Sequence, residues 1–160
     1  MRDTFLQLIR LGIAIVALAA LLFWADRAFF APKRLPACVQ GELPEGRVCL
    51  DTLRAQGLDK VIWIDARSES DFEVNHIMMA ENRSFPIRPG AQFDHQVDAA
   101  IDRLVGAGER GEVVVVFCTR SCESAEGIAA RLRELGLIEA PVYVLEGGWD
   151  ALKADGTLVR

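Results

Sequence analysis

The sequence predicts an α/β fold in which a central, mainly parallel sheet is flanked by helices. Three short apolar runs, at residues 61–64, 113–117 and 142–145, have the continuous hydrophobicity of strands buried on both faces. Between them lie segments in which apolar residues recur at helical spacing. Buried strands that alternate with amphipathic helices are typical of parallel sheets, whose ligand sites lie beyond the carboxyl ends of the strands.

The two longest helical patterns cover residues 96–105 and 124–135. The first is apolar at Val97, Ala100, Ile101, Leu104 and Val105. The second is apolar at Ala125, Ile128, Ala129, Leu132 and Leu135. Gly136 then stands where a helix-ending glycine is expected. A shorter helix is predicted to begin after Ser68, because Ser68 and Asp71 have the spacing of a capping box.

The amino-terminal part of the chain differs in composition from the rest. Residues 5–25 form an apolar stretch of 21 residues in which Gln7 and Arg10 are the only strongly polar side chains, and a membrane-spanning helix needs about 20 residues. We therefore expect residues 1–31 to form a transmembrane anchor. The alternative is a cleaved signal segment, with Ala17-Leu18-Ala19 as the cleavage motif.

Two further regions complete the predicted organisation. Residues 32–46, which contain Cys38, are expected to form a linker, and residues 47–160 a single folded domain. Cys38 and Cys49 bracket a short loop rich in glycine and proline. They are either a disulfide pair or two unrelated thiols, and a disulfide would require an oxidising compartment.

The location of the domain is predicted from the same cysteines. Basic residues flank both ends of the apolar stretch, so the distribution of positive charge does not decide the topology. We expect a single-pass membrane protein whose soluble domain lies on the extracytoplasmic, periplasmic side, with a cytoplasmic-facing domain as the alternative. A protein partner in the membrane would be consistent with such an anchor.

Composition excludes several classes of function. The 160 residues carry a net charge of −5, whereas nucleic-acid-binding proteins present a basic patch or stripe. A hydrophobic fraction of 51% argues against global disorder. The two histidines, His76 and His95, lie far from the cysteines in sequence, and we predict neither a metal site nor a cofactor.

Cys118 is the strongest candidate for a reactive group. It directly follows the run at residues 113–117, and so stands at the carboxyl end of a predicted central strand. Backbone N–H groups and a helix N-terminus at this position stabilise a thiolate, the nucleophilic form of cysteine. The polar loop that follows comprises Thr119, Arg120, Ser121, Cys122 and Glu123, with a helix beginning at about Ser124. The alternative is a buried structural cysteine.

Four short motifs surround this cysteine in order along the chain. They are Asp65-Ala66-Arg67, then Asp71-Phe72 with Asn75-His76-Ile77, then the loop of Cys118, and then Leu145-Glu146-Gly147-Gly148-Trp149. In this order they resemble the signature of the single-domain rhodanese-like (sulfurtransferase) family, over roughly residues 47–152. The resemblance implies a rhodanese-like fold.

The resemblance also implies a chemistry and a set of site residues. Cys118 would carry sulfane sulfur as a persulfide, taken from a sulfane-sulfur donor and passed to a thiol or cyanide acceptor. The loop residues Thr119, Arg120, Ser121, Cys122, Glu123 and Ser124 would surround this sulfur. Structural support would come from Asp65, Arg67, His76, Gly147 and Gly148.

Departures from the family pattern leave alternatives open. Glu123 places negative charge beside an anionic intermediate, which disfavours small anionic donors such as thiosulfate. Ser124 stands where phosphatase and arsenate reductase relatives need an arginine, which argues against that branch. Cys122 can resolve an oxidised Cys118, so a thiol–disulfide relay is an alternative function. A non-catalytic docking module is the third hypothesis.

Overall fold

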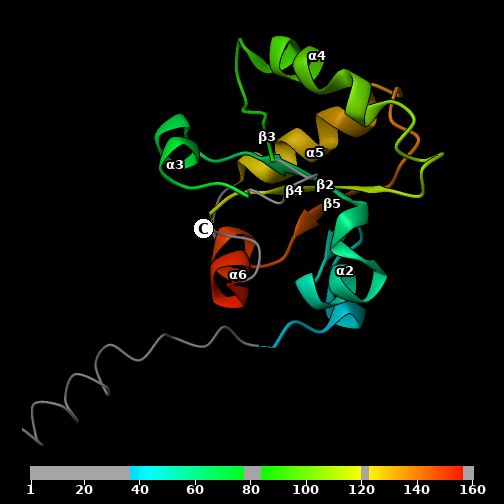
Figure 1. Cartoon of the computed structure of the whole chain (residues 1–160), viewed down its shortest axis with the longest axis vertical. Coiled ribbons are helices and arrows are strands. Elements are labelled where there is room, and N and C mark those ends of the chain that lie inside the picture. The colour runs from blue at the N-terminus through cyan, green and yellow to red at the C-terminus, as the bar shows by residue number, and fades with distance from the viewer. Residues whose placement is uncertain (1–36, 78–83, 120–122, 157–160) are drawn as a thin grey trace, which may run out of the picture. The chain divides into compact units, whose positions relative to one another are not determined.

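The computed structural model describes residues 37–77, 84–119 and 123–156. They form an α/β fold (Figure 1). Its one sheet has five strands, all parallel, in the order β1-β5-β4-β2-β3. The predicted fold class is therefore confirmed. The strands are β1 (Arg47–Val48), β2 (Val61–Asp65), β3 (Phe85–Pro86), β4 (Val113–Phe117) and β5 (Val142–Leu145).

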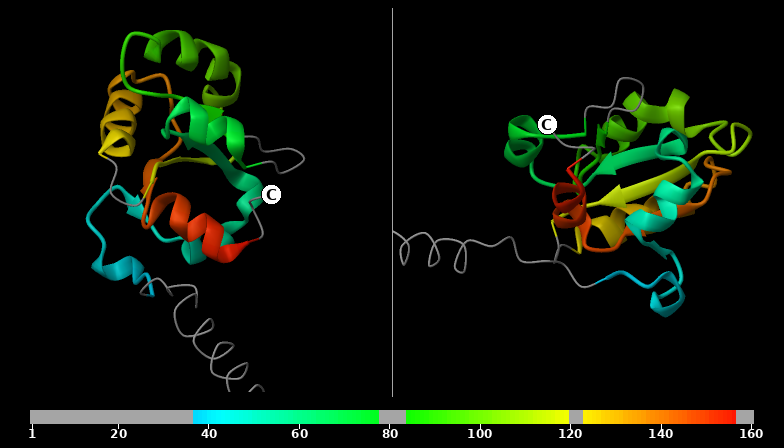
Figure 2. Two further views of the ribbon diagram at one scale, coloured as in Figure 1. Left: turned by 90° about the vertical axis from the view of Figure 1, so that its left-hand side faces the viewer. Right: turned by 60° about the horizontal axis from the view of Figure 1, so that its bottom comes forward.

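Helices cover both faces of the sheet (Figures 1 and 2). One face packs against α4 and α5, and the other against α2 and α6. The α-helices are α2 (Leu50–Gln56), α3 (Glu69–Val74), α4 (Phe93–Leu104), α5 (Ser124–Glu134) and α6 (Gly148–Asp155). Two short 3₁₀ helices, η1 (Gln40–Glu42) and η2 (Leu58–Lys60), complete the elements of the described residues.

The continuous apolar runs follow from burial on both faces of the sheet. In β2, Ile62 and Ile64 pack with α4 and α5, whereas Val61 and Trp63 pack on the opposite side with α2 and α6. Side chains alternate between the two faces of a strand. A strand covered on both sides therefore needs apolar residues at almost every position, as β2, β4 and β5 have; the exception in β2 is Asp65, the last residue of the strand.

The two long helices differ from their predicted bounds at the ends. The helix expected at residues 96–105 begins earlier, because Phe93 is buried and opens its first turn. Val105 was predicted on the apolar face, but it follows the helix with an extended backbone and is 47% exposed. Leu135 likewise falls just beyond α5 and is 39% exposed, ahead of Gly136 at φ 64°.

The Ser68 cap predicted at the start of α3 is confirmed, but the Asp71 carboxylate accepts from the Ser68 hydroxyl at 2.7 Å and not, as in a capping box, from the Ser68 backbone N–H. The side-chain oxygen of Ser68 accepts a hydrogen bond from the backbone N–H of Asp71, 3.2 Å away. Asn75 follows the helix with φ −160°. This is an extended conformation that any residue adopts.

A disulfide joins the first described segment to the sheet. Cys38 and Cys49 are bonded to each other, and Cys49 lies between β1 and α2 with 1% of its surface exposed. Gln40 adds two hydrogen bonds, accepting from the N–H of Cys49 at 2.8 Å and donating to the carbonyl of Arg47 at 3.0 Å. These contacts attach residues 37–46 to β1 and α2.

The predicted membrane anchor at residues 1–31 lies outside the described residues. Within the described ranges, no helix combines the length and the apolarity that a bilayer crossing requires.

The first prediction concerns the Cys38–Cys49 bond. We expect the double substitution Cys38→Ala and Cys49→Ala to lower the free energy of unfolding by about 3 kcal/mol, because the unfolded chain regains the entropy of the closed loop. Urea unfolding of the full chain measures this loss. Gly41→Ala in the same loop is the control, since its new Cβ meets no atom within 4 Å. An equal loss in both variants would contradict the assignment.

Candidate active site

Cys118 lies at the carboxyl end of β4, the strand at the centre of the sheet. Only 4% of its surface is exposed. Its Sγ lies 3.7 Å from the carbonyl oxygen of Ala66, which follows β2, and 3.9 Å from Oγ1 of Thr119. Cys118 is disulfide-bonded in this structure, and the described residues include no free cysteine. The sulfur is therefore placed at the sheet edge in an oxidised form.

The loop after Cys118 is described only at its two ends. Thr119 and Glu123 are exposed, and Ser124 begins α5. Arg120, Ser121 and Cys122, which we predicted to surround the sulfur, lie outside the described residues. The described part of the loop thus contributes one hydroxyl group beside the sulfur and one exposed carboxylate at the start of α5.

The turn before α6 fixes the backbone of Cys118. The N–H of Trp149 donates a hydrogen bond of 2.7 Å to the carbonyl oxygen of Cys118. A Cβ on Gly148 would collide with that same oxygen, and Gly148 has φ 49°. Gly147 precedes it at φ 74°. The paired glycines therefore allow the closest approach between the α6 turn and the cysteine.

A buried ion pair lies next to this turn. The carboxylate of Asp65 accepts from Nε of Arg67 at 2.9 Å and from Nη2 at 2.6 Å, and their side chains are 0% and 2% exposed. The guanidinium carbon of Arg67 lies 3.5 Å from the ring centroid of Trp149. Nη2 also donates to the carbonyl of Asn75 at 2.7 Å. Arg67 thus joins the end of β2, the segment after α3, and α6.

His76 makes its contacts with Phe72, in the helix that precedes it. Its Nδ1 is 2.9 Å from the carbonyl oxygen of Phe72, and its ring stacks on the Phe72 ring with centroids 4.5 Å apart. Among the contacts of the described residues, none joins His76 to Cys118. His95 is exposed on the first turn of α4.

Arg47 is a site feature that the sequence did not reveal. Its Nη1 lies 2.6 Å from Glu146 at the end of β5, and its Nη2 lies 2.7 Å from Glu126 in the first turn of α5. The pKa of the Arg47 guanidinium is raised, chiefly by the hydrogen bond to Glu146. Arg47 stays cationic and holds β1, β5 and α5 together beside the cysteine loop.

The comparison with known families decides what kind of domain this is. The sequence matches the rhodanese-like domain over residues 50–155. The chain belongs to the rhodanese-like family. No curated protein matches the sequence.

Solved structures resemble the rhodanese-like domain at low identity. They include the BH2092 protein of Bacillus halodurans, with 21% identity, a TM-score of 0.49, and coverage of 71% of this chain and 75% of that one. An As-Sb reductase of Leishmania major has 23% identity, a TM-score of 0.49, and coverage of 71% and 83%. A rhodanese-related protein of Thermoplasma volcanium has 17% identity, a TM-score of 0.46, and coverage of 71% and 96%.

The close approach at Gly148 gives the second prediction. We expect Gly148→Ala to destabilise the rhodanese-like domain by about 1–3 kcal/mol, since the new Cβ must displace the Cys118 carbonyl from its hydrogen bond to Trp149. Gly127→Ala is the matched control, because Gly127 lies inside α5 with no atom near its Cβ position. We expect the control to be neutral or slightly stabilising. Thermal or urea unfolding compares the two, and equal stabilities would disprove the assigned contact.

The buried charge pair gives the third prediction. We expect Arg67→Met to destabilise the domain by about 3–5 kcal/mol, because Asp65 would stay buried without its cation. Arg131→Met is the control. Arg131 also lies over an aromatic ring, Phe93, at 3.8 Å, but its side chain is 48% exposed. The control is expected to lose less than about 1 kcal/mol. Chemical denaturation measures both, and similar losses would refute the role of burial.

Proposed function

We propose that this rhodanese-like domain is a sulfurtransferase that moves sulfane sulfur through a persulfide on Cys118. The placement of Cys118 carries the proposal. Its sulfur lies at the carboxyl end of the central strand, and its backbone is fixed by Trp149 and by the Gly147-Gly148 turn. Ligand sites of parallel sheets lie at this edge. The family membership supports the same assignment.

The proposed reaction consists of two displacements at sulfur. The Cys118 thiolate attacks the outer sulfur of a donor persulfide, so that an S–S bond forms to Cys118 while the donor's S–S bond breaks and the donor leaves as a thiolate. An acceptor thiolate then attacks the terminal sulfur and carries it away. Cys118 returns as a thiolate, and no net oxidation takes place. Cyanide in place of the thiol acceptor yields thiocyanate.

The charges around the cysteine support a preference among donors. Glu123 is exposed at the start of α5, at the end of the loop that begins with Cys118. Like charges repel, so this carboxylate disfavours an anionic donor that approaches the thiolate. We therefore propose a neutral or protein-borne persulfide as the donor, in preference to thiosulfate.

The fourth prediction tests sulfur transfer by intact mass. The full chain is reduced with dithiothreitol, because Cys118 is disulfide-bonded here, and the reductant is then removed. Addition of cysteine persulfide is expected to add one sulfur atom, which cyanide then removes. Thiosulfate is expected to react more slowly. Cys118→Ser gains no sulfur, whereas Cys38→Ala with Cys49→Ala gains it as the wild type does. Failure of the reduced wild type to gain sulfur would overturn the proposal.

The disulfide on Cys118 favours a second candidate function, a thiol–disulfide relay. Cys38 and Cys49 are bonded to each other, so we infer that Cys122 is the partner of Cys118 in the relay. In this reaction two thiols of a substrate protein are oxidised to a disulfide, and the Cys118 disulfide is reduced to two thiols. Two electrons and two protons pass to the domain in this half-reaction, and a disulfide on a second partner protein must then accept them, becoming two thiols itself, to restore the Cys118 disulfide.

The fifth prediction separates the two functions. Under sulfur transfer, Cys122→Ser retains turnover and no longer needs prior reduction, because Cys118 then stays a thiol. Under the relay, the same substitution abolishes turnover. Parallel assays of thiocyanate formation and of oxidation of a dithiol peptide measure the two activities. Loss of both activities in Cys122→Ser, with a persulfide never detected, would leave the relay as the function.

The proposed location of the enzyme is a membrane, with the rhodanese-like domain on the periplasmic side. The Cys38–Cys49 disulfide supports this, because such bonds persist in oxidising compartments. Protease added outside the inner membrane of intact spheroplasts would degrade a domain on that side. Protection of the domain until the membrane is lysed would overturn the proposed topology.

A further inference from the structure

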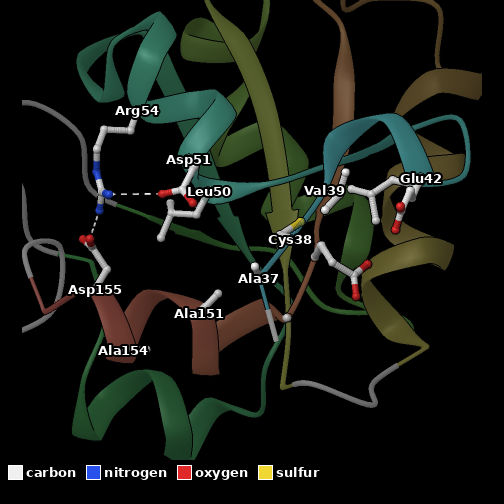
Figure 3. A pocket seen from close by; sticks show the side chains of 13 residues that line it. Ala37, Cys38, Val39, Glu42, Leu50, Asp51, Arg54, Ala151, Ala154 and Asp155 are labelled. Atoms are coloured by element: carbon white, nitrogen blue, oxygen red, sulfur yellow. Dashed lines mark hydrogen bonds and ion pairs between the residues drawn. The ribbon is translucent and has the colours of Figure 1, made fainter. Parts of the chain in front are cut away.

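A cavity of about 720 Å³ lies beside the disulfide, apart from Cys118. Figure 3 shows it between residues 37–43, the start of α2, and α6. Its volume falls within the range of about 300–1,000 Å³ that is typical of small-molecule sites. The cavity extends to the carboxyl edge of the sheet, because Glu146 and Gly147 line it, but Cys118 is not among its lining residues. The cavity is therefore separate from the site proposed for sulfur transfer.

The lining combines an apolar surface with negative charge. Aliphatic side chains are supplied by Val39, Leu43, Leu50, Ala151 and Ala154. Four carboxylates, those of Glu42, Asp51, Glu146 and Asp155, stand against a single guanidinium, that of Arg54. A ligand that fits this lining has an apolar body and a positive charge.

The carboxylates are not equally available to a ligand. Arg54 pairs with both Asp51 and Asp155 (Figure 3), and Glu146 pairs with Arg47. Glu42 forms no ion pair with any residue that the structure describes. Its carboxylate is exposed at the cavity. Glu42 is thus the group on which a bound cation would be centred.

We propose that this cavity is a second binding site, which takes a small organic cation consisting of an ammonium group on an aliphatic body. The aliphatic part lies against α6 and Leu50, and the ammonium group lies at Glu42. Small anions are excluded by the excess of carboxylates. This inference goes beyond the proposed sulfur transfer and does not depend on it.

The Cys38–Cys49 disulfide holds one wall of the site. Residues 37–43 provide Cys38, Val39, Glu42 and Leu43 to the lining, and the disulfide fastens them to the start of α2. A dithiol that reduces this bond is itself oxidised to a disulfide and leaves two thiols, so the wall loses its covalent attachment. Binding of the cation therefore depends on the oxidised state of this pair.

Calorimetric titration of the full chain with hexylammonium tests the proposal, with hexanoate as the probe of opposite charge. We expect saturable binding of hexylammonium and no binding of hexanoate. Ala151→Leu fills the cavity and is expected to weaken binding at least about tenfold. Lys153→Leu is its control, because it adds an apolar side chain on the same helix at a residue that does not line the cavity.

Charge and disulfide are tested in the same titration. Glu42→Lys is expected to weaken binding about tenfold or more, since it replaces an attraction with a repulsion. Glu45→Lys makes the same change at an exposed residue that does not line the cavity, and is expected to keep the wild-type affinity. Cys38→Ala with Cys49→Ala is expected to lose binding, whereas Cys118→Ser keeps it. Circular dichroism confirms that each variant is folded.

Three results would overturn the second site. The first is the absence of saturable hexylammonium binding. The second is equal binding of hexylammonium and hexanoate, which would indicate non-specific partition into apolar surface. The third is an equal effect of Glu42→Lys and Glu45→Lys, or of Ala151→Leu and Lys153→Leu. None of these results bears on whether Cys118 gains sulfur, so the two proposals fail independently.

Discussion

The positively charged side chain of Arg67 is buried. The residues that neutralise this charge determine how the carboxyl edge of the sheet is arranged. Asp65 supplies the opposite charge, while Trp149 presents its ring face to the guanidinium. A buried charge is tolerated only when it is paired and hydrogen-bonded. Because the backbone N–H of Trp149 also donates to the carbonyl of Cys118, one residue both covers the guanidinium of Arg67 and fixes the backbone of the candidate cysteine.

Around this cluster, the edge of the sheet divides into two regions. On one side lies Cys118, enclosed by Ala66, Thr119 and the Gly147-Gly148 turn. On the other side lies the acidic cavity bounded by the disulfide. The turn at Gly147 borders both regions. One short segment of chain therefore separates the proposed site of sulfur transfer from the proposed cation site, and each has its own disulfide-bonded cysteine.

Much of the fold was predictable because burial on both faces leaves a direct trace in the sequence. The runs at β2, β4 and β5 are apolar at almost every position. The spacing of Ser68 and Asp71 predicts the start of α3. The strands β1 and β3 left no such trace, because two residues are too few to show periodicity. Phe93 opens α4 earlier than predicted because its burial depends on tertiary packing.

The candidate site was predictable only in part, for a related reason. Cys118 is recognised because a cysteine directly after an apolar strand has a fixed place at the sheet edge. The contact of Arg67 with Trp149 joins residues far apart in the chain, and the role of Arg47 arises only when β1 pairs with β5. The cavity also depends on long-range packing, because residues 37–43 and α6 are far apart in the sequence and line the same cavity only in the folded chain.

The short strands β1 and β3 limit strand pairing between copies of the protein. Both are edge strands, and each has only two residues. A long free edge recruits strands from other chains and so leads to aggregation. Here one edge offers Pro86, which has no N–H to donate, and the other carries the charged Arg47. The apolar strands β2, β4 and β5 are thereby kept inside the sheet, so a chain with such a hydrophobic centre still presents little backbone for intermolecular pairing.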